Sequence, residues 1–354
     1  MIVNQWLPTA HDGDAIGNSA RRVCGLLRQM GHASNVFAIE IEPALTGEVL
    51  PFDDPAAFGG DVTIFHYGIE SPMTAAFQRL SGRRVLQYHN VTPAEFFAPW
   101  DPALARLASR GRDELATLIA HVDAAVGDSE FNRRELEAAG FYRTSVLPVA
   151  IDTARVTAPV TRPALEAVLD DGLMNFLFVG RIAPNKKIED HIRLAAQYSR
   201  SVDAACRFIF VGRHDVVPRY YSAIRALIAR FNLPGSRVVF SGPVSDEELA
   251  VYYQCADVYV SLSEHEGFCV PLVEAMASEV PVLAYAAAAV PETLGGAGVQ
   301  FSTKDYEATA ELLGELAFND TLRAGVIAGQ RHRLAEFGAA HVSTALAALI
   351  GSLS

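Results

Sequence analysis

The chain has 354 residues, half of them apolar, so it can bury the cores of two domains of ordinary size. Its formal net charge of −12 argues against nucleic acid as a partner, because a phosphate backbone requires a basic surface. Four widely separated cysteines without metal-ligand spacing, no basic leader and no apolar run long enough to cross a bilayer together favour a reduced, cytoplasmic protein.

Strand-like apolar runs alternate with helix-like segments along the chain, which predicts parallel α/β sheets covered by helices on both faces. In the first half, strands are expected near 1–6, 34–40, 61–66, 84–89, 123–127 and 145–149. Helices are expected near 18–30, 71–81, 102–121 and 130–139. Gly31, Gly82 and Gly140 follow three of these helices, where a left-handed residue commonly ends a helix. Residues 1–150 are therefore predicted to form one Rossmann-like domain.

The alternation is interrupted at residues 151–172, which we predict to be a linker, and resumes in a second Rossmann-like domain at 173–335. The second set of strands is expected near 174–180, 206–212, 237–242, 257–262, 281–285 and 298–301. Its helices are expected near 188–200, 218–231, 246–255, 271–278 and 306–317, followed by a helical tail at 321–336 and 338–352. Ser245 and Glu248 have the spacing of a capping box at the start of one helix.

The run from Glu264 to Met276 joins a predicted strand to a predicted helix and places a carboxylate in each part. Ligands bind beyond the carboxyl ends of strands in open parallel sheets, and the free amides at a helix start attract anions. Glu266 would stand at this edge, Gly267 would let the backbone approach a ligand, and Glu274 would lie about two turns into the helix. A phosphate linked to sugars satisfies both the amides and the carboxylates.

A second predicted strand, 174–180, is followed by three cations, Arg181, Lys186 and Lys187. Arginine offers a planar fork and lysine a compact charge, a combination that suits two neighbouring phosphates. The chain has only three lysines, and two of them lie in this loop. Arg181 and Lys186 are therefore candidate phosphate ligands, whereas Lys187 is expected to be a solvated loop residue, with phosphate binding as the competing interpretation.

These segments resemble glycosyltransferase family 4, whose members are retaining enzymes that use nucleotide sugars and have the GT-B fold. The resemblance is carried by Gly180-Arg181 with Lys186, by Glu266-Gly267-Phe268 with Glu274, and by Val290-Pro291-Glu292. Weaker similarities lie in the loop from Gly13 to Asn18, at Gly31-His32, at 146–152 and in the run from Val244 to Leu249. The resemblance spans nearly the whole chain and is strongest in its C-terminal half. One departure is that many relatives have adjacent glycines where this chain separates Gly13 from Gly17.

The resemblance implies a GT-B architecture, in which two Rossmann-like domains face each other across a cleft and the C-terminal helix, 336–354, packs back on the N-terminal, acceptor-side domain. Arg181 and Lys186 would neutralise the departing diphosphate, Glu266 would orient the donor sugar and Glu274 would hold the ribose hydroxyls. Further contacts to the nucleotide sugar would come from Gly13, Gly17, Val244, Gly267, Phe268, Cys269 and Val270. His89 would approach the donor sugar, with a strand-end histidine bonded only to its own domain as the competing interpretation.

The expected function is retaining transfer of a hexose-type sugar from a nucleotide diphosphate sugar to a glycan or lipid-linked acceptor, in bacterial surface polysaccharide or glycolipid synthesis. A GDP-mannose-like donor is preferred to a UDP-sugar. No cofactor or divalent metal is expected, although Asp12-Gly13-Asp14 has the letters of a metal-binding pair. Arginines of the N-terminal half are expected on solvated helix faces, with contact to anionic lipid at the inner face of the membrane as the competing interpretation. The alternatives are a nucleotide-sugar epimerase of the same fold and a non-catalytic nucleotide-sugar sensor.

Overall fold

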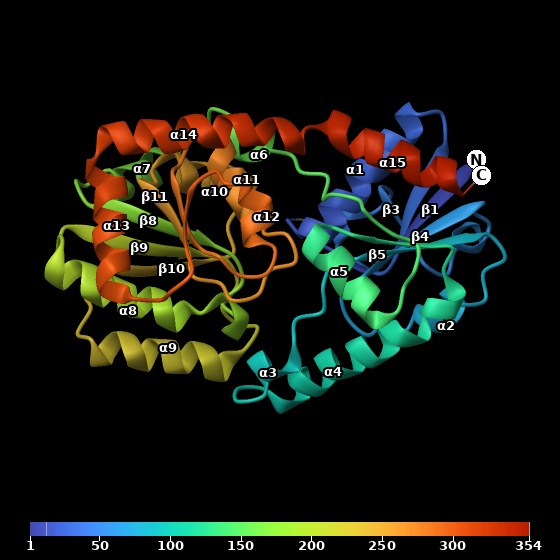
Figure 1. Ribbon diagram of the computed structural model, residues 1–354, viewed down its shortest axis with the longest axis horizontal. Helices are drawn as coiled ribbons and strands as arrows, with labels where there is room; N and C mark the ends of the chain where they lie inside the picture. Colours follow the sequence, from blue (N-terminus) through green and yellow to red (C-terminus); the bar gives the residue numbers. More distant parts are fainter. Residues whose placement is uncertain (12, 354) are drawn as a thin grey trace. The chain divides into compact units, whose positions relative to one another are not determined.

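The computed structural model describes residues 1–11 and 13–353, and the chain divides into two compact units (Figure 1). The first unit comprises Met1–Glu95, Ala103–Ile151 and Glu336–Ser354. The second comprises Phe96–Pro102 and Asp152–Ala335. Each unit is a parallel sheet with helices, so the predicted fold class is confirmed.

The first unit contains a seven-stranded sheet with the order β3-β2-β1-β4-β5-β6-β7. Every neighbouring pair is parallel. The strands are β1 (Ile2–Ala10), β2 (Ala33–Ile41), β3 (Val49–Pro51), β4 (Val62–Tyr67), β5 (Arg83–Tyr88), β6 (Ala124–Gly127) and β7 (Thr144–Val146). The helices of this part of the chain are α1 (Ala15–Gln29), α2 (Thr74–Phe77), α3 (Ala94–Phe97), α4 (Pro102–Thr117), α5 (Glu130–Ala139) and α15 (Ala339–Ser352).

The core of the first unit joins segments from both ends of the chain. Apolar side chains of β1, β4, β5 and β6 pack against Val23 and Leu27 of α1 and against Val342, Leu346 and Ile350 of α15. Figure 1 shows α15, drawn in red, beside α1. The C-terminal helix is thus part of this core, as the sequence predicts.

Capping side chains fix the helices that follow two of these strands. Asp14 accepts a hydrogen bond from the Gly17 amide at the start of α1, and Ser129 accepts one from the Asn132 amide at the start of α5. Gly140 ends α5 at φ 109°, in the left-handed region that only glycine adopts easily. The residues that follow β1 and β6 are therefore held by defined local bonds.

The second unit contains a six-stranded parallel sheet with the order β10-β9-β8-β11-β12-β13. The strands are β8 (Met174–Val179), β9 (Cys206–Val211), β10 (Val238–Gly242), β11 (Val258–Ser261), β12 (Val282–Tyr285) and β13 (Val299–Phe301). The helices are α6 (Ala154–Thr157), α7 (Pro163–Leu169), α8 (Ile188–Ser201), α9 (Pro218–Arg230), α10 (Asp246–Gln254), α11 (Val270–Ala277), α12 (Val290–Leu294), α13 (Tyr306–Phe318) and α14 (Asp320–Leu334). The expected capping box of Ser245 and Glu248 is present at the start of α10.

Three expectations from the sequence need correction. The segment 151–172 is more than a linker, because it forms α6 and α7, which bury Val156 and Leu169 and group with the second unit. Residues 96–102 also group with the second unit, where Trp100 packs edge-on against Tyr220 at a centroid distance of 5.2 Å. The helix expected at 71–81 is the single turn α2, and Gly82 lies five positions beyond it, where a Cβ would lie 2.5 Å from the Gly60 carbonyl oxygen.

One helical stretch, Asp320–Ser352, is long and apolar enough by length and composition to count as a candidate membrane span, with a mean hydropathy of 1.4. The expectation that no stretch would reach this length is therefore wrong by that criterion. The stretch consists of α14 and α15 separated by a 3-10 turn, Ala335–Phe337. The larger apolar side chains of α15, Val342, Leu346, Leu349 and Ile350, lie in the core of the first unit.

Candidate active site

The loop after β8 presents the predicted cations at the carboxyl end of the strand. The start of this loop passes close to the end of β9: a Cβ at Gly212 would lie 2.4 Å from the Gly180 carbonyl oxygen, so position 212 requires glycine. Arg181 is exposed, and its side chain makes no hydrogen bond or ion pair with any described residue. An arginine held at a strand end without an internal partner keeps all its donors for a ligand.

Lys186 and Glu266 meet directly. The Lys186 ammonium lies 2.5 Å from Glu266 Oε2, and the two side chains are 17% and 8% exposed. Lys186 ends the 3-10 turn after β8, and Glu266 lies in the loop between β11 and α11. The structure therefore brings together a predicted phosphate ligand and a predicted sugar ligand as an ion pair. A ligand at this site competes for the pair or binds beside it.

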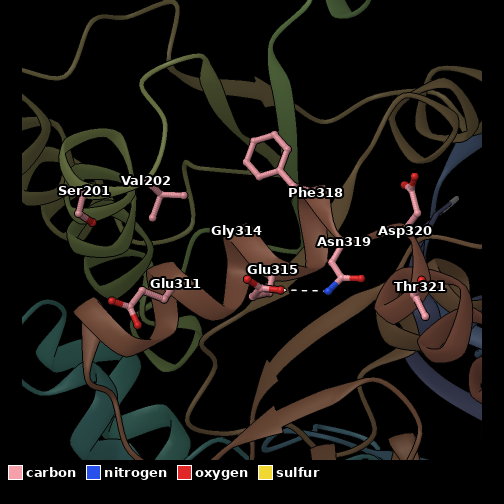
Figure 2. Close-up of a pocket in the computed structure, with 9 residues that line it drawn as sticks. All are labelled: Ser201, Val202, Glu311, Gly314, Glu315, Phe318, Asn319, Asp320 and Thr321. Carbon is pink, nitrogen blue, oxygen red and sulfur yellow. Dashed lines mark hydrogen bonds between the residues drawn. The ribbon is translucent and has the colours of Figure 1, made fainter.

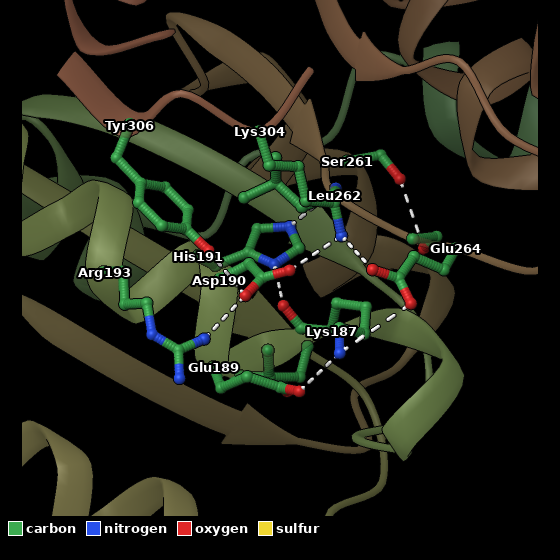
Figure 3. Close-up of polar contacts among 12 residues, drawn as sticks. Lys187, Glu189, Asp190, His191, Arg193, Ser261, Leu262, Glu264, Lys304 and Tyr306 are labelled. Atoms are coloured by element: carbon green, nitrogen blue, oxygen red, sulfur yellow. Dashed lines mark hydrogen bonds and ion pairs between the residues drawn. The ribbon is translucent and has the colours of Figure 1, made fainter. Parts of the chain in front are cut away.

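The other two lysines also bind carboxylates around this loop (Figure 3). Lys187, in the left-handed region at φ 52°, pairs with Glu189 at 2.9 Å and lies 3.7 Å from Glu264. Lys304 Nζ donates to Asp190 at 2.7 Å and to Glu264 at 2.8 Å. All three lysines of the chain thus border the segment 264–266, although only Lys186 was expected near it.

Asp190 is the buried centre of this network. Besides Lys304, it accepts hydrogen bonds from Arg193 and from the Tyr306 hydroxyl, both at 2.7 Å. Burial alone would raise the pKa of Asp190, but the bonds from Lys304 and Tyr306 outweigh burial and lower it. Asp190 is therefore a charged anchor that holds Lys304 against Glu264.

The start of α11 has the features of an anion site. Cys269 precedes the helix at φ 74°, in the left-handed region, and caps none of the helix amides with its side chain. Burial and the nearby Glu266 carboxylate raise the pKa of the Cys269 thiol well above its usual value, so the thiol stays neutral. The predicted contact residues Gly267, Phe268 and Val270 flank it in the same turn.

Glu274 lies inside α11, as predicted, but its carboxylate is already engaged. Arg155 donates to Oε1 from Nε at 3.0 Å and from Nη2 at 2.7 Å, and the Tyr253 hydroxyl donates to Oε2 at 3.0 Å. The Glu274 side chain is 1% exposed. Ribose hydroxyls that bind Glu274 would have to share its oxygens with Arg155 or displace Arg155.

The remaining predicted contact residue of this unit, Val244, is half-buried and directly precedes Ser245, the N-cap of α10. In the first unit, Gly13 has φ 77° after β1, and Gly17 lies buried in the first turns of α1.

His89 follows β5, and its side chain is 2% exposed. Its Nδ1 lies 2.7 Å from Asp128 Oδ2, and its Nε2 lies 2.8 Å from His66 Nδ1. Both of its ring nitrogens are thus bonded within its own unit, as the competing interpretation anticipates.

Comparison with known proteins places these features in a family. The family model described as Glycosyl transferases group 1 matches residues 174–319. The GDP-mannose-dependent alpha-mannosyltransferase of Mycobacterium tuberculosis is 30% identical over 321 residues, which cover 80% of this chain and 78% of that protein. The chain belongs to the group 1 glycosyl transferases.

Other relatives of this glycosyl transferase agree with that assignment. A GDP-mannose-dependent alpha-mannosyltransferase of Mycolicibacterium smegmatis is 37% identical over 107 residues, 30% of this chain and 24% of that protein. Among solved structures, HepE of Anabaena in complex with UDP and glucose superposes with a TM-score of 0.76 at 17% identity, over 99% of this chain and 100% of that one. At that identity the likeness establishes the fold alone.

No group of three or more histidine, cysteine, aspartate or glutamate side chains that could hold a metal ion occurs among the described residues of this glycosyl transferase. The Asp12-Gly13-Asp14 pattern is only partly observable, because Asp12 lies outside the described residues, and Asp14 serves as the cap of α1.

A cavity of about 720 Å³ lies between the end of α8, α13 and the start of α14 (Figure 2). Its wall includes Val202, Glu311 and Phe318, and none of the predicted site residues. We assign it no role in the reaction.

Two residues of the glycosyl transferase site escaped the sequence analysis. Arg155 lies in the segment expected to be a linker, and its partner Glu274 is 119 positions away. Lys304 follows β13, 40 positions from Glu264. The scarcity of lysine was the one available signal, since two of the three lysines lie in the loop after β8 and one of them, Lys186, had been assigned to the site.

Proposed function

We propose that this glycosyl transferase moves a hexose, preferably mannose from a GDP-mannose-like donor, to a glycan or lipid-linked acceptor with retention at the anomeric carbon. The observation that carries the proposal is the ion pair of Lys186 and Glu266, together with Arg181 of the same loop, whose side chain bonds none of the described residues. The cations suit a leaving diphosphate and the carboxylate suits sugar hydroxyls. The mannosyltransferase names of the two mycobacterial relatives support the choice of sugar and base.

Retention is proposed on chemical grounds. Double displacement needs a carboxylate free to attack the anomeric carbon. Glu266 is tied to Lys186 and Glu274 to Arg155, so both carboxylates of the motif are committed to cations. We therefore favour a same-face reaction, in which the leaving phosphate oxygen takes the acceptor's proton as the new glycosidic bond forms. The positive charge of Arg181 and Lys186 would stabilise the departing diphosphate without a metal ion.

The proposal is tested by incubating the purified protein with a panel of GDP- and UDP-sugars, with and without glycan and lipid-linked acceptors. Donor binding should raise the unfolding midpoint, and NMR of the product should show the anomeric configuration of the donor. Sugar transfer should persist in excess EDTA. An epimerised donor without transferred sugar would instead identify an epimerase, and tight binding without turnover would identify a sensor.

Arg181→Ala is the sharpest variant for this test, because Arg181 is exposed and bonded to no described side chain. The substitution should lower kcat about 100- to 1000-fold while leaving the unfolding midpoint unchanged. Arg331→Ala is the matched control, since it removes an exposed arginine that pairs with Glu279 on the surface of the second unit. Equal activity of the two variants would remove Arg181 from the site.

A further inference from the structure

Four buried side chains form a continuous hydrogen-bonded chain across the sheet of the first unit. Gln5 lies in β1, His66 in β4, His89 just after β5 and Asp128 just after β6, and these four strands are neighbours in the sheet. Gln5 Oε1 is 3.0 Å from His66 Nε2, His66 Nδ1 is 2.8 Å from His89 Nε2, and His89 Nδ1 is 2.7 Å from Asp128 Oδ2. Each ring nitrogen therefore has one polar partner, and the protons between them can be assigned in sequence.

The Gln5 end of this hydrogen-bonded series determines which group donates in each of its bonds. Gln5 Nε2 donates to the Ala20 carbonyl oxygen at 2.9 Å, so the amide oxygen of Gln5 must face His66. The opposite orientation would place that oxygen against the Ala20 carbonyl, which is an acceptor only. His66 Nε2 therefore carries a proton and donates a hydrogen bond to Gln5 Oε1.

His66 holds only this one proton. It is fully buried, and burial together with the adjacent His89 lowers its pKa well below the usual value, so the ring is neutral. The His66 and His89 rings are within 8° of parallel with centroids 5.1 Å apart, and their facing nitrogens are separated by 2.8 Å. The rings therefore lie edge to edge in one plane, as a linear N–H···N bond requires. With its proton on Nε2, His66 can only accept at Nδ1, so His89 Nε2 must donate.

The other nitrogen of His89 faces Asp128, which also accepts a hydrogen bond from Gln87 Nε2 at 3.2 Å. A 2.7 Å contact between a ring nitrogen and a carboxylate needs a proton between them, and this proton is additional to the one on His89 Nε2. We infer that His89 is an imidazolium cation locked between Asp128 and His66, and that Gln5 and His66 are the positioning residues that enforce this charge.

This inference does not depend on the proposed sugar transfer, and it changes what His89 can do. An imidazolium with both N–H groups committed accepts no proton and serves as no general base. It contributes a fixed positive charge directly after β5. Gln5 sets that charge through His66 without contacting His89, because the polarity of each bond dictates that of the next.

The test is ¹⁵N NMR of the full chain labelled at histidine, at pH 7.5, with the His66 and His89 signals assigned from His66→Gln and His89→Gln variants. Both ring nitrogens of His89 should resonate in the protonated range, and His66 should carry its proton on Nε2 only. An unprotonated nitrogen in the His89 ring of the wild-type protein would overturn the inference. An unprotonated Nδ1 would place the extra proton on Asp128 instead.

A pair of isosteric variants tests the role of Gln5. Gln5→Met removes the acceptor that holds the proton of His66 on Nε2, so His66 can move it to Nδ1 and His89 should lose the proton on its own Nε2. Gln87→Met is the matched control, because Gln87 is equally buried and donates to Asp128, while its side chain makes no hydrogen bond to either histidine ring in the described part of the chain. His89 should stay doubly protonated in Gln87→Met. An unchanged His89 in Gln5→Met, or a neutral His89 in both variants, would contradict the assigned role of Gln5.

Discussion

The ammonium group of Lys186 lies 2.5 Å from Glu266 Oε2, although the two residues are 80 positions apart in the chain. This contact joins the loop after β8 to the loop after β11, two strands that are neighbours in the sheet. The ion pair has two separable consequences, one for stability and one for catalysis.

Lys186→Met should lower both the free energy of unfolding and kcat. The substitution leaves the Glu266 carboxylate, 8% exposed, without its cation, which should cost about 1–3 kcal/mol of stability. The double variant Lys186→Met/Glu266→Gln should recover most of this stability, since no charge remains unpaired, but none of the activity. Urea denaturation and initial rates with the preferred donor measure the two effects. Recovery of activity in the double variant would show that the pair has only a structural role.

Arg155→Leu should destabilise the second unit more than any surface arginine does. Among the described side chains, it leaves the buried Glu274 with the Tyr253 hydroxyl as its one donor, which should cost about 3–5 kcal/mol. Arg162→Ala is the matched control, because Arg162 comes from the same segment and pairs with Glu247 on α10, but both partners are about half exposed. The Arg162→Ala substitution should lower the free energy of unfolding by less than about 1 kcal/mol. Equal unfolding midpoints in urea for the two variants would contradict this account of Glu274.

Lys304→Met should weaken donor binding by releasing the loop that carries Glu264 and Glu266. Lys304 also lies over the Tyr285 ring, 4.6 Å from its centroid, so its position is fixed by packing as well as by charge. The expected result is a higher KM for the donor, a smaller change in kcat and a loss of about 1–3 kcal/mol in stability.

Arg193→Met provides the control for Lys304, because it removes a more exposed partner of the same Asp190 carboxylate. It should cost less than about 1 kcal/mol and leave KM unchanged. A KM for Lys304→Met equal to that of Arg193→Met would show that Lys304 does not position the loop.

His191 should make stability depend on pH in the acidic range. The ring is fully buried, its Nε2 accepts from the Leu262 amide at 3.2 Å and its Nδ1 lies 3.0 Å from the Lys187 carbonyl oxygen, to which it donates. Burial lowers the pKa of His191 to about 4. Because the unfolded chain takes up this proton at a higher pH, the stabilisation is complete above about pH 6.5 and is lost as pH falls toward 4.

The His191 contribution is isolated by comparing the wild-type protein with His191→Gln, whose amide can make both bonds without titrating. Between pH 7.5 and 5 the wild-type protein should lose about 2 kcal/mol more than the variant, as measured by urea denaturation. If the free energy of unfolding falls equally with pH in the two proteins, a group other than His191 causes the loss of stability in acid.

The sheets were predictable because their strands are apolar runs bounded by glycine or polar residues, and every predicted strand has a counterpart. The strand β3 was missed because three residues, Val49–Pro51, give no periodic signal. The short helices α6 and α7 were missed because Thr157 to Pro163 has the composition of a loop. Helix α6 forms because Val156 is buried and Arg155 bonds Glu274, and neither contact is visible in a local pattern.

The candidate site was predictable as a set of residues but not as a set of bonds. The motif residues around Lys186 and Glu266 were found through strand-end positions and family resemblance. Their direct pairing was not, since each was assigned separately to a ligand. The orientation of His89 depends on Gln5 and His66, which lie 61 positions apart and carry no shared motif. Long-range polar contacts of this kind follow only from the assembled sheet.

Helix α15 supplies the last residues of the chain to the core that also holds β1 and α1. During synthesis on the ribosome, the first unit therefore emerges early but cannot complete its interior until Val342–Leu353 has left the exit tunnel. The second unit has all of its residues outside the tunnel sooner and can fold first. A nascent polypeptide stalled before residue 336 should consequently expose the apolar surface of β1 and α1 to chaperones.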